Sequence, residues 1–383
     1  MGTKRRRRKS TLAGLPGYVL LLVILLLWLF QELRPGPVSS PAQAERGGVE
    51  VYFLPQEGEA AKARLVALIT GAKESLEGAF YEFRDLEIAR ALLRAKERGV
   101  RIRVYGESDY RSDFRRYLVG AALGQQGETP RVPQEALRQR VKPLSLDCEE
   151  ITGIPVCFDE REGFMHHKFL VVDGKAVWTG STNMTWNAFA RNNENSLLLP
   201  SPTLAQGYAK EFQALFGGNK EGLGEPVAFA LTDENLSLEG TAYFSPRGGP
   251  MARGALLERL KAAREEILVA AFVLTDQEVV KALVQAQRRG VGVQVLLETR
   301  NLRDSREDDL LRAGVAVRKD GNPYTLHHKV MVIDGTWVVT GSYNFTARAW
   351  QVNNENLLIL KSPSLAERYR QEFLRLWQEG TPL

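Results

Sequence analysis

All four histidines of this 383-residue chain lie in two copies of one pattern. Residues 165–183 read MHHKFLVVDGKAVWTGSTN, and residues 326–344 read LHHKVMVIDGTWVVTGSYN. An imidazole can attack phosphorus or carry a proton, a lysine can neutralise an oxyanion, and serine and asparagine can donate to its oxygens. Covalent cleavage of a phosphodiester needs two imidazoles, one to attack phosphorus and one to protonate the departing oxygen. The two copies therefore predict a phosphate site to which each copy contributes one histidine.

An Asp-Gly pair interrupts the apolar run of each copy and predicts a hairpin with a two-residue turn. In that hairpin the numbers of facing residues add up to 347 in the first copy, which pairs His166 with Ser181. Because strand side chains alternate, one face is predicted to carry His166, Lys168, Ser181 and Asn183, and in the second copy His327, Lys329, Ser342 and Asn344. The opposite face is predicted to pack inward with Phe169, Val171, Ala176 and Trp178. The second histidine of each pair points the other way, so we predict packing roles for His167 and His328.

A carboxylate follows both patterns at the same distance. Glu194 in RNNENSLL lies 28 residues after His166, and Glu355 in VNNENLLI lies 28 residues after His327. A carboxylate that accepts one ring N–H fixes the tautomer and aims the other ring nitrogen. We predict that these glutamates orient the histidines, and exposed glutamates at strand ends are the alternative.

The chain repeats itself outside these patterns as well. ALLRAKERGVRIRVY at 91–105 matches ALVQAQRRGVGVQVL at 282–296, and GIPVCFDEREGFMHHK at 153–168 matches GVAVRKDGNPYTLHHK at 314–329. The offsets are 191 and 161, so the first half carries about 30 extra residues within 109–151. Helical spacing, as in residues 64–75 and 86–98, alternates with strand patterns, which predicts two α/β domains, 49–226 and 227–383.

The basic character of the chain is confined to its N-terminus. Residues 1–44 carry seven Lys/Arg and one acid, whereas the remainder has 44 basic and 45 acidic residues, which argues against a globally basic nucleic-acid face. KRRRRK precedes an apolar run at 18–30, so residues 1–34 are predicted to be a signal-anchor or a signal peptide cleaved after Ala44. Residues 35–48 are predicted to be a linker. In both cases the domains that follow are exported, either membrane-anchored or secreted.

The two cysteines, Cys148 and Cys157, lie nine residues apart. Outside the cytoplasm such a pair predicts a disulfide, and two buried free thiols are the alternative. No zinc-type ligand spacing is present, so we expect no metal and no cofactor.

The two copies match the motif HxKxxxxDxxxxxxGSxN of the phospholipase D superfamily at every defined position, and the chain resembles a fused pair of the short bacterial endonuclease/phospholipase D-like units. The resemblance implies two similar α/β/α sandwich halves related by a pseudo-twofold axis, with the site between them and activity as a monomer. By analogy with the family, His166 is the nucleophile that forms a phosphohistidine, and His327 is the acid/base, although the roles can be exchanged. Lys168, Lys329, Asn183 and Asn344 would hold the phosphate oxygens. Asp173 and Asp334 complete the catalytic motif, although the hairpin puts them in turns.

The resemblance leaves open which of the family's substrates this chain acts on. A phospholipid substrate is favoured by the membrane address and by apolar residues near the motifs, Trp186, Phe189 and Trp350. An exported endonuclease acting on DNA or RNA is favoured by the short-unit resemblance and by residues 109–143, with seven basic and four acidic residues. The residues after each GSxN lack the usual cardiolipin synthase continuation, which weakens the reading as a cardiolipin synthase or transphosphatidylase. A non-catalytic binding protein is disfavoured because every motif residue is present.

Overall fold

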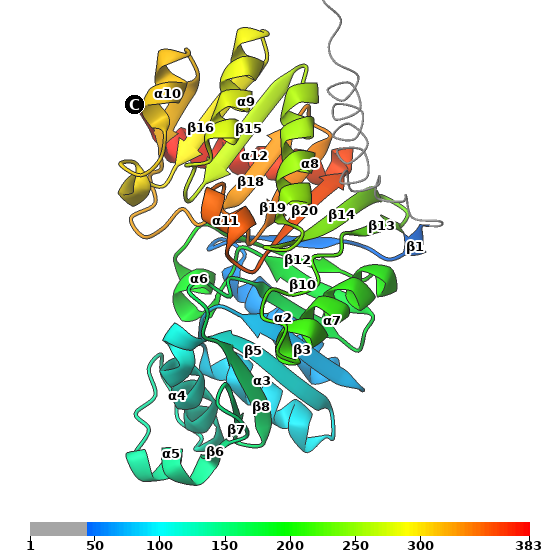
Figure 1. Cartoon of the computed structure of the whole chain (residues 1–383), viewed down its shortest axis with the longest axis vertical. Helices are drawn as coiled ribbons and strands as arrows, with labels where there is room; N and C mark the ends of the chain where they lie inside the picture. Colours follow the sequence, from blue (N-terminus) through cyan, green and yellow to red (C-terminus); the bar gives the residue numbers. More distant parts are fainter. Residues whose placement is uncertain (1–43) are drawn as a thin grey trace, which may run out of the picture. The chain divides into compact units, whose positions relative to one another are not determined.

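The computed structural model describes residues 44–383 and contains two large β-sheets and one two-stranded sheet (Figure 1). The nine-stranded sheet has the order β2 (Glu50–Leu54), β12 (Glu194–Leu199), β10 (Ala176–Gly180), β9 (Lys168–Val172), β3 (Ser75–Phe80), β5 (Arg101–Glu107), β8 (Ile154–Asp159), β7 (Cys148–Ile151) and β6 (Val141–Pro143). The ten-stranded sheet has the order β1 (Glu45–Arg46), β13 (Val227–Thr232), β14 (Ser237–Ser245), β20 (Glu355–Lys361), β19 (Trp337–Gly341), β18 (Lys329–Ile333), β15 (Glu266–Ala271), β16 (Gly292–Leu297), β17 (Ala316–Lys319) and β21 (Thr381–Pro382). The short pair is β4 (Phe83–Arg84) with β11 (Met184–Thr185).

The same strand order occurs in both large sheets. The run β2-β12-β10-β9-β3-β5-β8 recurs as β14-β20-β19-β18-β15-β16-β17. In each run the first strands pair antiparallel and the last three, such as β3, β5 and β8, pair parallel. The internal repeat of the sequence is therefore a repeat of the fold. β6 and β7 belong to the extra segment of the first half, and β1, within the predicted linker 35–48, pairs in parallel with β13.

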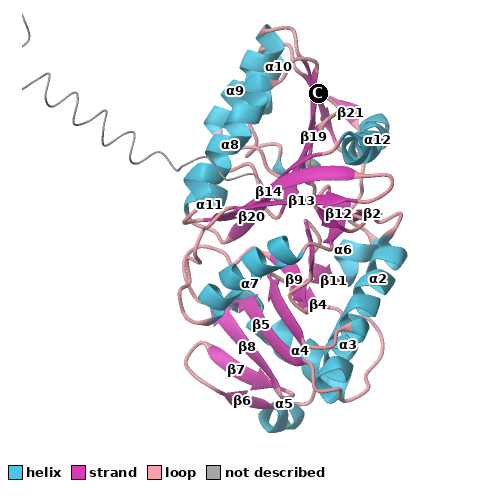
Figure 2. Ribbon diagram, turned by 90° about the vertical axis from the view of Figure 1, so that its right-hand side faces the viewer, coloured by secondary structure: helices cyan, strands magenta, loops and turns pink. Residues whose placement is uncertain are grey.

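The helices connect the strands and cover the sheets (Figure 2). They are α2 (Gly58–Gly71), α3 (Leu86–Glu97), α4 (Arg111–Ala122), α5 (Gln134–Arg140), α6 (Trp186–Ala190), α7 (Pro202–Phe216), α8 (Gly249–Ala262), α9 (Gln277–Arg288), α10 (Glu307–Arg312), α11 (Ala347–Gln351) and α12 (Pro363–Glu379), with short 3₁₀ turns η1 (Ser108–Tyr110) and η2 (Thr299–Asn301). The Asp85 carboxylate caps α3 by accepting two backbone N–H groups, and Asp276 caps α9 in the same way. The helix predicted at 64–75 begins earlier and ends at Gly71, because Ser75 already belongs to β3.

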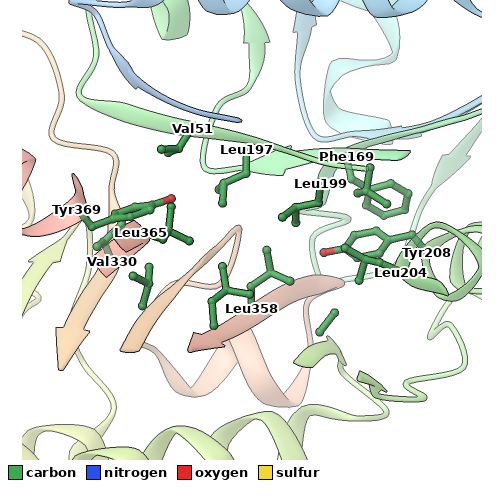
Figure 3. Close-up of a cluster of buried hydrophobic side chains, with 14 of the residues drawn as sticks. Val51, Phe169, Leu197, Leu199, Leu204, Tyr208, Val330, Leu358, Leu365 and Tyr369 are labelled. Carbon is green, nitrogen blue, oxygen red and sulfur yellow. The ribbon is translucent and has the colours of Figure 1, made fainter. Parts of the chain in front are cut away.

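The largest hydrophobic core is shared by the two halves (Figure 3). Its members from the first half include Val51, Phe169, Leu197, Leu199, Leu204 and Tyr208, and those from the second include Val330, Leu358, Leu365 and Tyr369. α7 contacts strands of both large sheets, and the α12 ring of Tyr369 packs edge-on against Phe53 of β2 at 5.0 Å. Truncating one such buried leucine to alanine costs about 2–5 kcal/mol, so each half depends strongly on the other.

The predicted hairpins form, but their register differs by one residue. Asp173 and Gly174 both have positive φ, and the Lys175 N–H donates to Val172 O at 2.9 Å. The first residues that pair across the two strands are nevertheless Val172 and Ala176. The numbers of residues that face each other therefore add up to 348 and not to the predicted 347. As a result Leu170, Val172 and Trp178 face the core under α2, α3 and α4, whereas Phe169, Val171 and Val177 face the shared core. The predicted apolar face was wrong because both faces of this hairpin are buried and three residues, not two, connect the strands.

The predicted disulfide is confirmed: Cys148 and Cys157 face each other on β7 and β8 and are bonded. The predicted signal-anchor, residues 1–34, and most of the linker lie outside the described residues. Between residues 44 and 383, no helix has the length and apolar character needed to cross a membrane.

Candidate functional site

Each motif histidine contacts the glutamate of the other half. The Nδ1 of His166 lies 2.8 Å from an oxygen of Glu355, and the Nδ1 of His327 lies 2.8 and 2.9 Å from the two oxygens of Glu194. Both carboxylates are completely buried. A carboxylate accepts the ring N–H, so each imidazole has its proton on Nδ1 and presents Nε2 for chemistry. The equal spacing of 28 residues thus pointed to the two glutamates that contact the motif histidines. Each glutamate, however, contacts the histidine of the other half and not that of its own half.

Two short parallel bridges bring these partners together. Met165 bridges Asn354, and the N–H of His166 donates to Asn354 O at 2.9 Å. Leu326 bridges Asn193 in the same manner, with a 2.9 Å bond from the N–H of His327 to Asn193 O. In a parallel bridge the residues that follow also lie side by side, which sets each histidine next to the glutamate after the asparagine.

Two buried carboxylates outside the motifs hold these bridges in place. Glu107, at the end of β5, accepts the N–H of Met165 at 2.7 Å, and Glu298 accepts the N–H of Leu326 at 2.6 Å. Neither residue was predicted from the sequence. Their offset of 191, the same as that of the preceding strands, was the signal that could have identified them.

The motif serines support the glutamates. The Ser181 hydroxyl donates to Glu194 at 2.6 Å and accepts the N–H of Asn195 at 3.0 Å. This contact requires the preceding glycine: Gly180 has φ +140°, and a Cβ there would lie 2.2 Å from Asn195 O. In the second half the N–H of Asn356 donates to the Ser342 hydroxyl at 3.0 Å. The serines therefore belong to the supporting part of the site.

The motif lysines are buried and lie over aromatic rings. The Nζ of Lys168 donates to the carbonyl of His166 at 2.7 Å and lies 4.7 Å from the centre of the Tyr81 ring. Lys329 repeats this arrangement over Phe272 at 4.8 Å. The same rings pack edge-on against the imidazoles, at 4.6 and 4.9 Å. Tyr81 and Phe272 were missed by the sequence analysis, although they too are 191 residues apart.

The motif asparagines differ between the halves. Asn183 donates to a Glu82 oxygen at 3.3 Å, and Glu82 in turn pairs with Arg84. The repeat places Val273 at the position equivalent to Glu82. Within the described residues, the Oδ1 atoms of Asn183 and Asn344 are buried without a hydrogen-bond partner. Buried amide oxygens without a partner are consistent with a polar ligand site.

Burial sets the protonation of the site. It lowers the pKa of both motif imidazoles well below 6.5, and the neighbouring lysine cations lower it further. Burial raises the pKa of both partner glutamates to about 7. It lowers the pKa of Lys168 to about 8 and that of Lys329 to about 7. A bound phosphate would favour the charged forms of the lysines and of one imidazole, so anion binding and protonation are coupled.

Comparison with known proteins identifies the family. The family profile described as "Cardiolipin synthase, PLD-like domain" matches residues 65–216 and 256–377, and each segment contains one motif. The chain belongs to the phospholipase D-like family.

Its relatives match over part of their length. A "Phospholipase D" of Rickettsia bellii is 39% identical over 148 residues, 38% of this chain and 72% of the relative. A "Mitochondrial cardiolipin hydrolase" of Xenopus laevis is 38% identical over 129 residues, 33% of this chain and 61% of the relative. The structure of a phosphatidylserine synthase from Haemophilus influenzae matches over 87% of both chains, with a TM-score of 0.60 and 14% identity. This last likeness concerns the fold alone.

Two sets of residues in the phospholipase D-like motifs have contacts other than the His–Glu pairs. The carboxylate of Asp173 accepts the backbone N–H groups of residues 73–75 at 2.8–2.9 Å, and Asp334 does the same for residues 264–266. These bonds fasten each hairpin turn to the start of a neighbouring strand, and the catalytic role expected for the two aspartates stays a prediction. His167 and His328 are buried as predicted, and their Nδ1 atoms lie 3.5 Å from Asn356 and 3.1 Å from Asn195.

Proposed function

We propose that this chain hydrolyses phospholipids at the headgroup phosphodiester through a metal-independent phosphohistidine intermediate. The observation that carries the proposal is the reciprocal arrangement of His166 with Glu355 and His327 with Glu194, which leaves two Nε2 atoms for the reaction. Two buried lysines beside them supply the positive charge that a phosphate needs.

The residues of the site account for each step. The Nε2 of His166 attacks phosphorus, the bond from phosphorus to the headgroup oxygen breaks, and His327 gives that oxygen a proton. His327, now neutral, takes a proton from water, whose oxygen attacks phosphorus and displaces His166. Glu194 stabilises the imidazolium form of His327 in the first step, and Glu355 keeps the ring of His166 oriented for attack. The assignment of the two roles follows the family resemblance.

The lipid substrate is supported by the names of the relatives, a phospholipase D and a mitochondrial cardiolipin hydrolase. It is further supported by exposed aromatic residues directly before the motifs, Phe164 and Tyr324. Phe189, expected near the substrate, is instead a core residue with 1% exposure, and Trp186 and Trp350 lie under arginines.

An exported endonuclease is the second candidate. The segment 109–143 was expected to offer a basic strip, but four of its seven basic residues form ion pairs: Arg111, Arg115, Arg116 and Lys142. Exposed Arg131, Arg138 and Arg140 are the observation that still favours a nucleic acid. Transfer to an alcohol in place of water, as in a cardiolipin synthase, would use the same intermediate.

We also propose that residues 49–226 and 227–383 are domains related by a pseudo-twofold axis and that a single chain is active. The repeated strand order and the exchanged His–Glu partners support both points. We propose further that residues 1–34 hold the domains at the outer side of a membrane, which agrees with the disulfide.

The test uses the full chain in EDTA with vesicles of phosphatidylcholine, phosphatidylglycerol or cardiolipin, and in parallel with plasmid and single-stranded DNA. We expect release of headgroup, or of phosphatidylglycerol from cardiolipin, and no DNA cleavage. If ethanol is added, transfer of the phosphatidyl group to the alcohol would yield phosphatidylethanol. DNA cleavage without lipid turnover would replace the phospholipid proposal with the nuclease, and loss of activity in EDTA that Mg²⁺ restores would refute the metal-free route.

A further inference from the structure

Several large exposed apolar side chains lie at the edge of the sheets that carries the site. Six are found among residues 44–383: Leu123 (39% exposed), Leu144 (55%), Leu146 (94%), Phe164 (37%), Tyr324 (46%) and Leu383 (44%). Four of these, Leu144, Leu146, Phe164 and Tyr324, belong to loops at the edge of the sheets where the site lies, and we call them the apolar rim. An isolated exposed leucine needs no explanation, but apolar residues that gather around a site indicate a binding surface.

The first two rim residues are held in place by a rigid turn. Leu144 and Leu146 lie between β6 and β7, in the segment that only the first half contains. The N–H groups of Leu144 and Ser145 donate to Cys148 O at 2.9 and 3.1 Å, and the disulfide to Cys157 lies at the base of the turn. The leucines are thus presented to solvent by a fixed backbone, which lowers the entropic cost of binding through them.

This turn lies on the same edge as the site. The parallel strands β3, β5 and β8 end there, and the chain passes directly from β8 to His166. β7 runs antiparallel to β8, so Asp147 lies beside Phe158, whose N–H donates to it at 2.8 Å. The Lys220 ammonium donates to the Asp147 carboxylate at 2.5 Å, and the Lys220 carbonyl accepts from the Asn354 amide at 3.1 Å, next to the site. Four strand spacings separate β7 from β9, roughly 19 Å.

The other two rim residues are aromatic, and each has arginines beside it. Phe164 precedes His166 by two residues and lies under Arg348 at 5.8 Å. Tyr324 lies under Arg191 at 4.9 Å, and its carbonyl accepts from Arg300. A phospholipid bilayer presents a phosphate layer above an apolar interior, and aromatic rings with flanking arginines suit that boundary.

We propose that the apolar rim docks onto the surface of a phospholipid bilayer, with its leucines and rings at the acyl boundary and the arginines beside the rings among the phosphates. This inference deepens the proposed function and rests on it, because docking would hold the site at the depth of headgroup phosphodiesters. A lipid surface fits better than a protein partner because the rim consists of separate loop tips, with arginines beside its two aromatic rings, rather than one continuous face.

Docking itself is tested by depth-dependent fluorescence quenching. The full chain carrying Leu146→Trp is compared with Leu123→Trp and with the unsubstituted chain, on phosphatidylcholine/phosphatidylglycerol vesicles with brominated acyl chains. Leu123 caps the far end of α4, a helix of 12 residues or roughly 18 Å that begins near the site, so it serves as the control. We expect the added Leu146→Trp emission to be quenched and the Leu123→Trp emission to be unaffected. Equal emission with and without bromine for both would overturn the proposal.

Quenching by bromine reports only the position of the added tryptophan. It therefore depends neither on catalysis nor on how the rest of the chain is held on the vesicle. For the functional consequence, Leu144→Ser/Leu146→Ser is expected to lower turnover of vesicle phospholipid about 10- to 100-fold and to leave turnover of a soluble nitrophenyl phosphodiester unchanged, whereas Leu123→Ser changes neither. Equal loss on both substrates would overturn docking and indicate misfolding. Quenching in a protein without phospholipid turnover would retain docking and refute the proposed function instead.

Discussion

Exchanging Glu355 for glutamine tests the central geometry most directly. The substitution keeps the shape of a fully buried side chain 2.8 Å from the imidazole of His166 and removes its charge. A hydrogen bond to a charged group contributes about 1.5–3 kcal/mol, which corresponds to a loss in kcat of about 10- to 150-fold. Because the glutamate belongs to the second half and its histidine to the first, this loss would arise across the two halves.

The pH–rate profile should also shift in a defined direction when either glutamate is replaced. A carboxylate beside an imidazole raises the pKa of the ring, so its removal lowers that pKa. His166 must be neutral to attack, and Glu355→Gln is therefore expected to shift the acidic limb of the pH–rate profile to lower pH. His327 must be protonated to act as an acid, so Glu194→Gln is expected to shift the basic limb to lower pH.

The assay measures headgroup release from vesicles between pH 4 and 9 for both variants. The exposed Glu74, which pairs with Lys175 on the surface, provides a matched control as Glu74→Gln and should behave as the unsubstituted chain. If Glu355→Gln shifted the basic limb and Glu194→Gln the acidic limb, the roles of the two histidines would be reversed. A kcat for Glu355→Gln within twofold of the control would refute the reasoning.

The remaining predictions concern the motif residues and the disulfide. His166→Asn and His327→Asn should each abolish turnover while thermal unfolding stays cooperative, and activity above a few per cent in either variant would exclude a two-histidine mechanism. Asp173→Ala should lower the free energy of unfolding by about 2–4 kcal/mol, since three backbone N–H groups lose their acceptor, and should leave kcat nearly unchanged in denaturant-free buffer. Cys148→Ser/Cys157→Ser should lower the free energy of unfolding by about 2–3 kcal/mol through the entropy of its short loop, which urea unfolding measures against the oxidised parent.

The sequence predicted what depends on local spacing. Fixed spacings in the sequence revealed the two motifs, the partner glutamates and the repeat. The disulfide was predicted from two cysteines that lie nine residues apart. The exchange of partners was not visible, because Glu194 and Glu355 stand at the same distance from their own histidines and only the bridges at Asn193 and Asn354 decide the pairing.

The one-residue error in the hairpins has a related cause. The turn rule treats Asp-Gly as an isolated connection, whereas the Asp173 carboxylate is bound to the backbone of residues 73–75 far away in the sequence. Glu107 and Tyr81 escaped notice because each is unremarkable at its own position and gains its role only when the strand ends converge. Long-range hydrogen bonds of this kind leave no periodic signal.

Joining both halves in one chain gives the site a freedom that a symmetric dimer lacks. In a pair of identical subunits every substitution enters the site twice, once from each subunit. Here Glu82, which accepts from Asn183, pairs with Arg84 in the first half, while the repeat places Val273 and Thr275 at the matching positions of the second. Each half can thus change independently at these positions, without the same substitution being imposed on the other.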